Sequence, residues 1–221
     1  PESRTAVRQA VTARRRPADA AVRTTAAYAA RADACIRRWG RRAKRCPALL
    51  RELLALAGPR AALLDLGCGA GQDARGLFAR RHHVVGVDST WSLLTYARRR
   101  NRRVPLIHGD MRALPFRPGA FDAIWAAASL IHLPKPAVRR LLRALCTMVP
   151  RGGLLAATVA HGRHAGFLRT GWIPGRYFAR WHRAELTRAV CLAGWEVLTL
   201  RAVVNRERKG RWLVLIARRV R

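Results

Sequence analysis

The stretch "LLDLGCGAG", residues 63–71, decides the fold expected for this chain. A short apolar run ends in Asp65, and Gly67, Gly69 and Gly71 follow it at alternate positions. A strand that ends in glycines and leads into a helix lets backbone N–H groups approach a ligand closely. The stretch therefore predicts a strand, a ligand-binding loop and the first turn of a helix.

Short apolar runs and helical stretches alternate along the rest of the chain. Strands are expected over residues 63–66, 83–87, 105–108, 121–128, 154–159, 195–204 and 211–217. Helices are expected over residues 48–57, 72–80, 92–100, 136–149 and 183–193, with an irregular segment over 160–181. The turn "NRERKG" is too short for a crossover helix, so the last two strands should be antiparallel. The fold class expected is α/β: a doubly wound, Rossmann-like sheet of seven mostly parallel strands, the last antiparallel, with helices on both faces.

Composition predicts a globular protein, because half of the residues are hydrophobic. No apolar run approaches the roughly 20 residues that a membrane-spanning helix needs, and nothing near Pro1 resembles a signal peptide. The five cysteines form no Cys-x-x-Cys pair. We therefore expect reduced thiols, a cytoplasmic location and no zinc site.

The net charge of +32 is the anomaly, with 44 Lys and Arg against 12 Asp and Glu. One interpretation is a partner with many phosphates, because basic surfaces attract nucleic acid of any sequence. The other is a genome that favours arginine codons, since only Lys44, Lys135 and Lys209 are lysines. The arginines are dispersed, which favours the second interpretation.

The glycine stretch fits two templates. Residues 69–74, "GAGQDA", match the dinucleotide pattern G-x-G-x-x-G/A, with Asp88, at the end of "VVGVD", about 20 residues further on. The second template accounts for Asp88 as well, and also for Asp65 and for Asp110 in "LIHGDM", which the dinucleotide pattern leaves unexplained. With "FDAIWAAASLIHL" and "PRGGLL", these motifs span residues 63–159 and as a set resemble the class I S-adenosylmethionine-dependent methyltransferases. The nearest resemblance is to the ubiquinone-biosynthesis-type group, also called methyltransferase type 11.

The resemblance implies S-adenosylmethionine as the cofactor. Asp88 would hold the ribose hydroxyls, and Asp65 would sit by the methionine end. Asp110 would accept a hydrogen bond from the adenine amino group, with Met111 behind the ring. The cofactor-binding residues expected in full are Asp65, Gly67, Cys68, Gly69, Gly71, Asp88, Ser89, Asp110, Met111 and, beside the transferable methyl group, Ala128 and Ser129.

The placement of the acids supports this interpretation independently. Asp65, Asp88, Asp110 and Asp122 all lie at or beside expected strand ends. A sulfonium cofactor carries a positive sulfur, an ammonium group and ribose hydroxyls, all of which favour carboxylate partners. Asp122 begins its strand, so we expect it to cap the structure away from the cofactor. Asp73 is expected in a first helical turn, where the helix dipole favours an acid.

Methyl transfer from a sulfonium needs alignment and exclusion of water, and a base is optional. His132 in "SLIHL" is the candidate base, with a structural hydrogen bond as the alternative. Tyr28 resembles the N-terminal tyrosine that many small-molecule methyltransferases fold over the cofactor; simple helix packing is the alternative. No set of His, Cys and acids has metal-ligand spacing, so no metal is expected.

The resemblance also implies a domain plan. Residues 1–45 would form an Arg-rich helical cap and residues 46–221 the methyltransferase domain, with a substrate-side insertion at 160–186. The aromatic and arginine side chains of that insertion would line an apolar pocket, stack nucleic-acid bases beside phosphates, or simply pack a lid. They are Phe167, Trp172, Tyr177, Phe178 and Trp181, with Arg169, Arg176, Arg180 and Arg183.

Three functions are open at this point. The first is methyl transfer to a small-molecule acceptor by in-line displacement at the carboxyl ends of the strands. The second is an RNA methyltransferase that uses the basic surface, because "RYFARWHRAEL" and "KGRWLVLIARR" resemble the tRNA wobble-uridine methyltransferases. The third is a catalytically silent cofactor-binding module. The sequence does not determine the oligomeric state.

Overall fold

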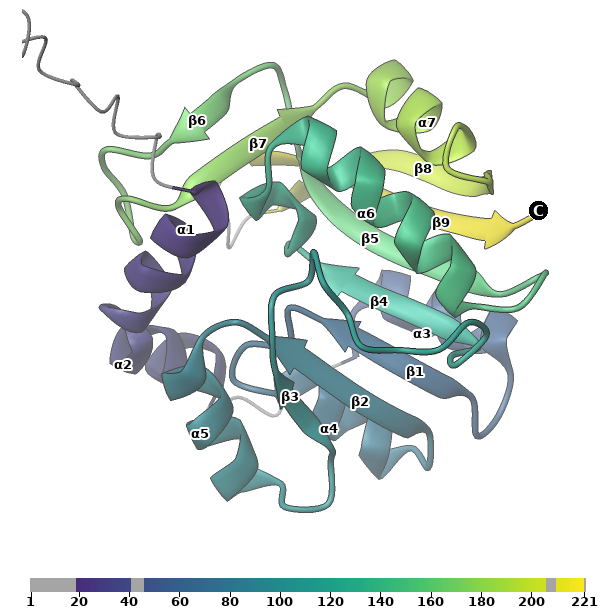
Figure 1. Cartoon of the computed structure of the whole chain (residues 1–221), viewed down its shortest axis with the longest axis horizontal. Helices are drawn as coiled ribbons and strands as arrows, with labels where there is room; N and C mark the ends of the chain where they lie inside the picture. The colour runs from purple at the N-terminus through teal and green to yellow at the C-terminus, as the bar shows by residue number, and fades with distance from the viewer. Residues whose placement is uncertain (1–18, 41–45, 206–209, 221) are drawn as a thin grey trace, which may run out of the picture.

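The computed structural model describes residues 19–40, 46–205 and 210–220 (Figure 1). Its strands are β1 (Ala62–Leu66), β2 (His83–Asp88), β3 (Leu106–His108), β4 (Ala123–Ala127), β5 (Leu154–His161), β6 (Ala165–Phe167), β7 (Tyr177–Trp181), β8 (Trp195–Asn205) and β9 (Gly210–Arg219). Its helices are α1 (Ala20–Ala29), α2 (Ala32–Cys35), α3 (Ala48–Ala57), α4 (Gln72–Ala79), α5 (Trp91–Arg100), α6 (Lys135–Met148) and α7 (Arg183–Cys191), with a π-helical turn η1 (Ile36–Gly40) and a 3₁₀ turn η2 (Leu130–His132).

The sheet is mostly parallel and ends in an antiparallel hairpin. Strands β3, β2, β1, β4 and β5 lie side by side and pair in parallel. Strand β9 runs antiparallel to β5 and to β8, as expected for the last two strands. The expected doubly wound α/β class is therefore confirmed. Most of the turn "NRERKG" between the last two strands lies outside the described residues.

The sequence interpretation of residues 160–181 as irregular is wrong. Strand β6 pairs antiparallel with β7, and β7 also pairs in parallel with the end of β5 through His161. The glycines and the proline of "TGWIPGR", which lies between β6 and β7, are typical of loops, and for this reason both strands were missed in the sequence. Gly171 and Gly175 have φ angles of +100° and +85°, so this run forms the connection between the two strands.

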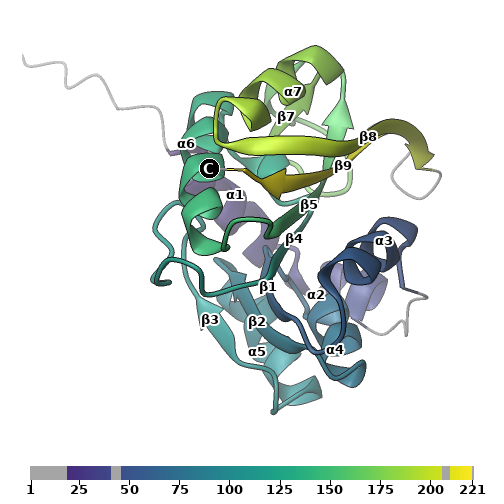
Figure 2. The same ribbon diagram turned by 90° about the vertical axis from the view of Figure 1, so that its right-hand side faces the viewer.

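Two apolar cores lie on opposite faces of the sheet. Leu64 of β1 packs in the core that contains the buried faces of α6 and α7. Leu63, its neighbour, packs in the core of α3 and α4, as the alternation of a strand requires. Figure 2 shows α6 and α3 on opposite sides of the sheet. Both faces are therefore covered, and the ends of the strands are left for a site.

The helices are short. The longest in the described part of the chain, α6, has 14 residues, and its apolar side faces the sheet. No described helix is long and apolar enough to cross a lipid bilayer.

Gly67 is the position in the glycine loop where a side chain is least tolerable. Its φ is +77°, and an added Cβ would lie 2.5 Å from Cβ of Ser129. We expect Gly67→Ala to lower the free energy of unfolding by about 2–4 kcal/mol, from backbone strain plus overpacking. Gly119 has a φ of +66° and no neighbour within 4 Å, so Gly119→Ala should lose only about 1–2 kcal/mol. Urea unfolding measures both losses, and equal losses would contradict the packing argument.

Candidate active site

A cavity of about 1520 Å³ opens at the carboxyl ends of β1, β2 and β4. The glycine loop, Asp88 and Asp110 line one end of it. From there it runs past His132 to side chains of α3 and of the β8–β9 hairpin. Pockets for one small ligand measure roughly 300–1,000 Å³. The cavity therefore has room for more than one small molecule.

Asp88 joins two of the loops at this end. Its Oδ2 accepts a hydrogen bond from the backbone N–H of Gly69 at 2.8 Å, and its Oδ1 accepts one from Thr90 at 2.7 Å. Burial raises the pKa of Asp88, and these two hydrogen bonds oppose the rise. A carboxylate oxygen accepts more than one hydrogen bond, so both oxygens keep capacity for a ligand.

Asp65 is buried at the end of β1, with 2% of its surface exposed, and does not line the cavity. Burial and the nearby Asp73 carboxylate raise the pKa of Asp65 well above its ordinary value. Its Oδ2 has no hydrogen-bond partner in the described part of the chain. Gly71, the left-handed N-cap of α4, also lies outside the lining.

Asp110 is linked to the helix that covers the cavity. Arg112 donates to both carboxylate oxygens of Asp110, and its Nη1 donates to Asp19 at 2.6 Å. Asp19 is the N-cap of α1. Partial burial raises the pKa of Asp110, but the hydrogen bonds from Arg112 outweigh it and hold that pKa below its ordinary value. This bridge ties the start of α1 to the loop after β3.

Two threonines fix the middle of α1. Thr25 Oγ1 lies 2.7 Å from Ser89 Oγ, in the loop after β2. Thr24 Oγ1 accepts a hydrogen bond from the backbone N–H of Tyr177 at 2.9 Å. Helix α1 thus spans the mouth between the β2 loop and β7, and Figure 1 shows it at the left, beyond the arrowheads of β1, β2 and β4.

His132 and Tyr28 are in direct contact. Nδ1 of His132 lies 2.9 Å from the carbonyl oxygen of Tyr177, so Nδ1 carries the proton and donates it. Nε2 of neutral His132 is then an acceptor, and the Tyr28 hydroxyl lies 2.9 Å from it. The structure brings together two candidates that are 104 residues apart. Both side chains line the cavity.

The exit from β4 is strained. Ala128 has a φ of +59°, a conformation that side-chain-bearing residues rarely adopt and that concentrates at functional sites. The following residue, Ser129, is buried, and its Oγ has no hydrogen-bond partner among the described residues. The same holds for Oε1 of Gln72 beside the glycine loop. Ala128, Ser129 and Gln72 all line the cavity.

The structure brings most of the expected cofactor residues to this cavity. The lining includes Gly67, Cys68, Gly69, Asp88, Ser89, Asp110, Met111, Ala128 and Ser129. Asp122 caps β1 at the opposite end of the sheet, where its Oδ2 accepts from the N–H of Ala62 at 2.8 Å. Asp73 does more than complement a helix dipole, because it accepts a hydrogen bond from the indole of Trp125 at 3.0 Å.

The residues of the 160–186 segment divide between cavity and core. Trp172, Arg176 and Phe178 line the cavity, whereas Trp181 is fully buried in the core. Sequence reasoning missed the roles of several residues in closing the site, namely Asp19, Thr24, Thr25 and Arg112. Arg112 carried a local signal, because it follows Asp110 by two positions, but the threonine contacts span 64 and 153 residues and have no local signature.

Residues 63–153 match the family described as "Methyltransferase domain". The chain is 30% identical over 122 residues to a malonyl-[acyl-carrier protein] O-methyltransferase of Legionella pneumophila, a match that covers 53% of this chain and 42% of that protein. It is 41% identical over 73 residues to an 18S rRNA (guanine-N(7))-methyltransferase of Mus musculus, covering 32% of this chain and 26% of that protein. The chain thus spans less than half the length of these relatives.

Among solved structures, a similar one is the 1,6-didemethyltoxoflavin-N1-methyltransferase of Burkholderia thailandensis, with bound 1,6-didemethyltoxoflavin and S-adenosylhomocysteine. The TM-score is 0.72 at 18% identity, and the match covers 91% of this chain and 89% of that chain. At 18% identity, this likeness shows that the two chains share a fold and nothing more.

Proposed function

We propose that this chain, which carries a class I S-adenosylmethionine-dependent methyltransferase domain, transfers a methyl group to a small-molecule acceptor held in the same cavity as the cofactor. The observation that carries the proposal is the cavity itself. It measures about 1520 Å³ and is lined by glycines and carboxylates together with aromatic side chains. That volume exceeds what one small ligand occupies.

The residues present fit the cofactor. Asp88 has acceptor capacity for two ribose hydroxyls, and Asp110 for an adenine amino group. The unpartnered acceptors Ser129 Oγ and Gln72 Oε1 lie where an ammonium group at the methionine end would find hydrogen bonds. Gly67 and Gly69, with positive φ, leave the loop open for close approach.

S-adenosylmethionine supplies an electrophilic methyl group on a positively charged sulfur when bound. Tyr28 and His132 would take the proton of the acceptor: the Tyr28 oxygen accepts it while its own proton passes to Nε2 of His132. The hydrogen bond from Nδ1 to the Tyr177 carbonyl keeps Nε2 in the acceptor state. Helix α1 would exclude water, which strengthens these polar contacts.

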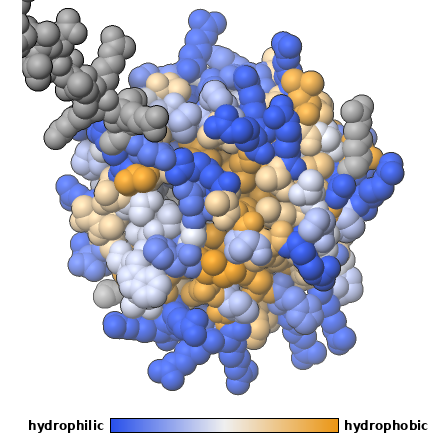
Figure 3. Space-filling view, in the orientation of Figure 1, coloured by the Kyte–Doolittle hydropathy of each residue, from blue (hydrophilic) through white to orange (hydrophobic). Residues whose placement is uncertain are grey.

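RNA is the alternative acceptor, supported by the charge of +32 and by the rRNA methyltransferase among the relatives. On the face in Figure 3, hydrophilic side chains surround an apolar centre on all sides and do not gather in one patch. A dispersed charge favours the small-molecule acceptor over a nucleic-acid track. A silent cofactor-binding module is the second alternative.

Label transfer tests the acceptor class. The chain is incubated with methyl-tritiated S-adenosylmethionine and an extract of the organism that encodes it, with and without RNase. We expect label in small molecules that partition into organic solvent, unaffected by RNase. Label in an RNase-sensitive polymer would establish the RNA alternative, and cofactor binding with no transfer would establish the silent module.

Asp88→Asn tests the placement of the cofactor. Loss of charge-assisted hydrogen bonds to the ribose should raise the dissociation constant for S-adenosylhomocysteine by about 10- to 100-fold. Asp122→Asn is the matched control, because Asp122 caps β1 away from the cavity, and its dissociation constant should stay within about twofold. Isothermal calorimetry measures both variants. Equal affinity in wild type and Asp88→Asn would remove Asp88 from the cofactor site.

Tyr28→Phe tests the proton path. The variant removes the hydroxyl that contacts His132, and we expect turnover of the labelled acceptor to fall by about 10²-fold or more, as general base catalysis typically contributes. S-adenosylhomocysteine affinity should change by less than about threefold. Tyr96→Phe, on α5 and outside the cavity lining, is the control. Unchanged turnover in Tyr28→Phe would leave the contact with a packing role alone.

A further inference from the structure

One cation in the lining of the cavity has a buried nitrogen without a hydrogen-bond partner. Arg176 lines the cavity, and its Nε is buried and makes no hydrogen bond within the described residues. A buried donor of a charged group that is left unpaired is costly, because it has lost its hydration. A ligand with an anionic oxygen would satisfy it.

The backbone around Arg176 is held in place. Its carbonyl oxygen accepts from the N–H of Leu168 at 3.0 Å, across the β6–β7 hairpin. The next residue, Tyr177, bonds to Thr24 through its N–H and to His132 through its carbonyl. The guanidinium carbon lies 5.4 Å from the centre of the Phe178 ring, within cation–π range. The cation is therefore positioned before any ligand arrives.

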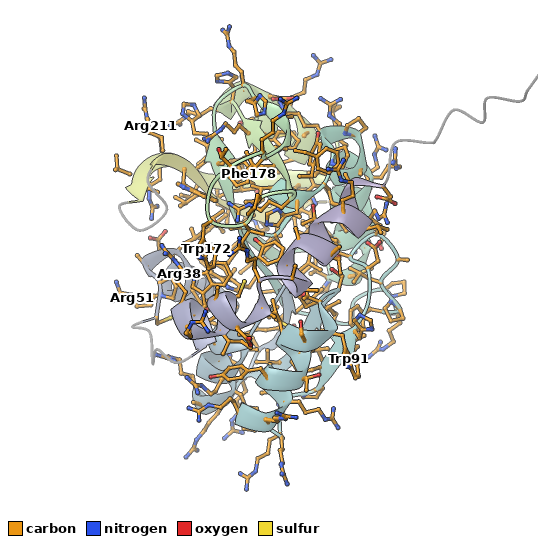
Figure 4. The ribbon with its side chains drawn as sticks, turned by 90° about the vertical axis from the view of Figure 1, so that its left-hand side faces the viewer. Arg38, Arg51, Trp91, Trp172, Phe178 and Arg211 are labelled. Carbon is orange, nitrogen blue, oxygen red and sulfur yellow. The ribbon has the colours of Figure 1, made fainter. Side chains whose placement is uncertain are left out.

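Other cations of the lining have partners in the structure. Arg201 forms an ion pair with Glu52 of α3. Arg38 lies over the Trp172 ring at 5.0 Å, and Figure 4 shows the two next to one another, on the side of the molecule where α1 lies. No ion pair between Arg176 and an acid occurs among the described residues. One unpaired positive charge matches one negative charge on a ligand.

Aromatic rings wall the space beside this cation. The Phe178 ring meets His132 and Trp212 edge to face, with centroids 6.3 Å away in both cases. Trp172 meets Trp39 in the same way at 4.6 Å. Aromatic side chains stack on, or pack edge to face against, other aromatic rings, so a cavity wall built from them favours a flat, apolar ligand.

We propose that the acceptor is an aromatic compound with a carboxylate, and that Arg176 binds this carboxylate and orients the nucleophile. The inference rests on the proposed function. A hydroxyl on the ring would give its proton to the Tyr28–His132 pair as its oxygen bonds to the methyl carbon. The carbon–sulfur bond breaks and the sulfur keeps the electron pair, so the products are a methyl ether and neutral S-adenosylhomocysteine. The proton leaves His132 for solvent.

The test uses protein saturated with S-adenosylhomocysteine and a panel of hydroxylated aromatic carboxylates of one to three rings, each with its neutral carboxamide. Calorimetry measures binding to wild type, Arg176→Gln, Arg176→Lys and Arg169→Gln. Arg169 is the control, because it is exposed, lies in the same segment and does not line the cavity. S-adenosylhomocysteine affinity is measured separately for every variant.

We expect wild type and Arg169→Gln to bind at least one carboxylate about tenfold or more tightly than its amide, as a charge-assisted contact provides. Arg176→Gln should lose this preference while it keeps S-adenosylhomocysteine affinity within twofold, and Arg176→Lys should keep part of it. Equal affinity for carboxylates and amides, no carboxylate binding at all, or a preference that survives in Arg176→Gln would overturn the inference. Failure of wild type to bind S-adenosylhomocysteine would instead overturn the proposed function.

Discussion

The carboxylate of Asp88 holds together the two loops on which the candidate site depends. One oxygen anchors the glycine loop at Gly69 and the other anchors the start of the next loop at Thr90. Burial of the charge is costly and raises its pKa, and the two backbone hydrogen bonds offset part of this cost. The intervening Ser89 reaches Thr25 of α1, so the same loop also holds the helix that covers the cavity.

The sparse acids are concentrated at the cavity. In a chain of net charge +32, the carboxylates of Asp73, Asp88 and Asp110 line it together with the glycine loop, where the proposed cofactor would lie. Arg176 lies in the same lining, with Trp172 and Phe178. Carboxylates and a guanidinium in one cavity favour a cationic and an anionic ligand held together, and holding two reactants together promotes their reaction.

Local patterns in the sequence predicted the parallel sheet, the glycine loop and the residues at its strand ends. Such patterns work because strand period and glycine chemistry act over a few residues. They failed over residues 160–181, where glycine and proline concealed β6 and β7. The contacts of α1 could not be predicted either, because Thr24 and Tyr177 are 153 residues apart in the sequence. His132 was recognisable as a candidate, but its contact with Tyr28 was not.

A crystal structure of the chain with S-adenosylhomocysteine tests the central claim most directly, that the cavity around Asp88 is a cofactor site. The account predicts ribose hydroxyls within hydrogen-bond distance of the Asp88 carboxylate and the amino-acid end over the loop from Gly67 to Gly69. Ligand bound elsewhere, or a cavity that stays empty at saturating S-adenosylhomocysteine, would contradict it.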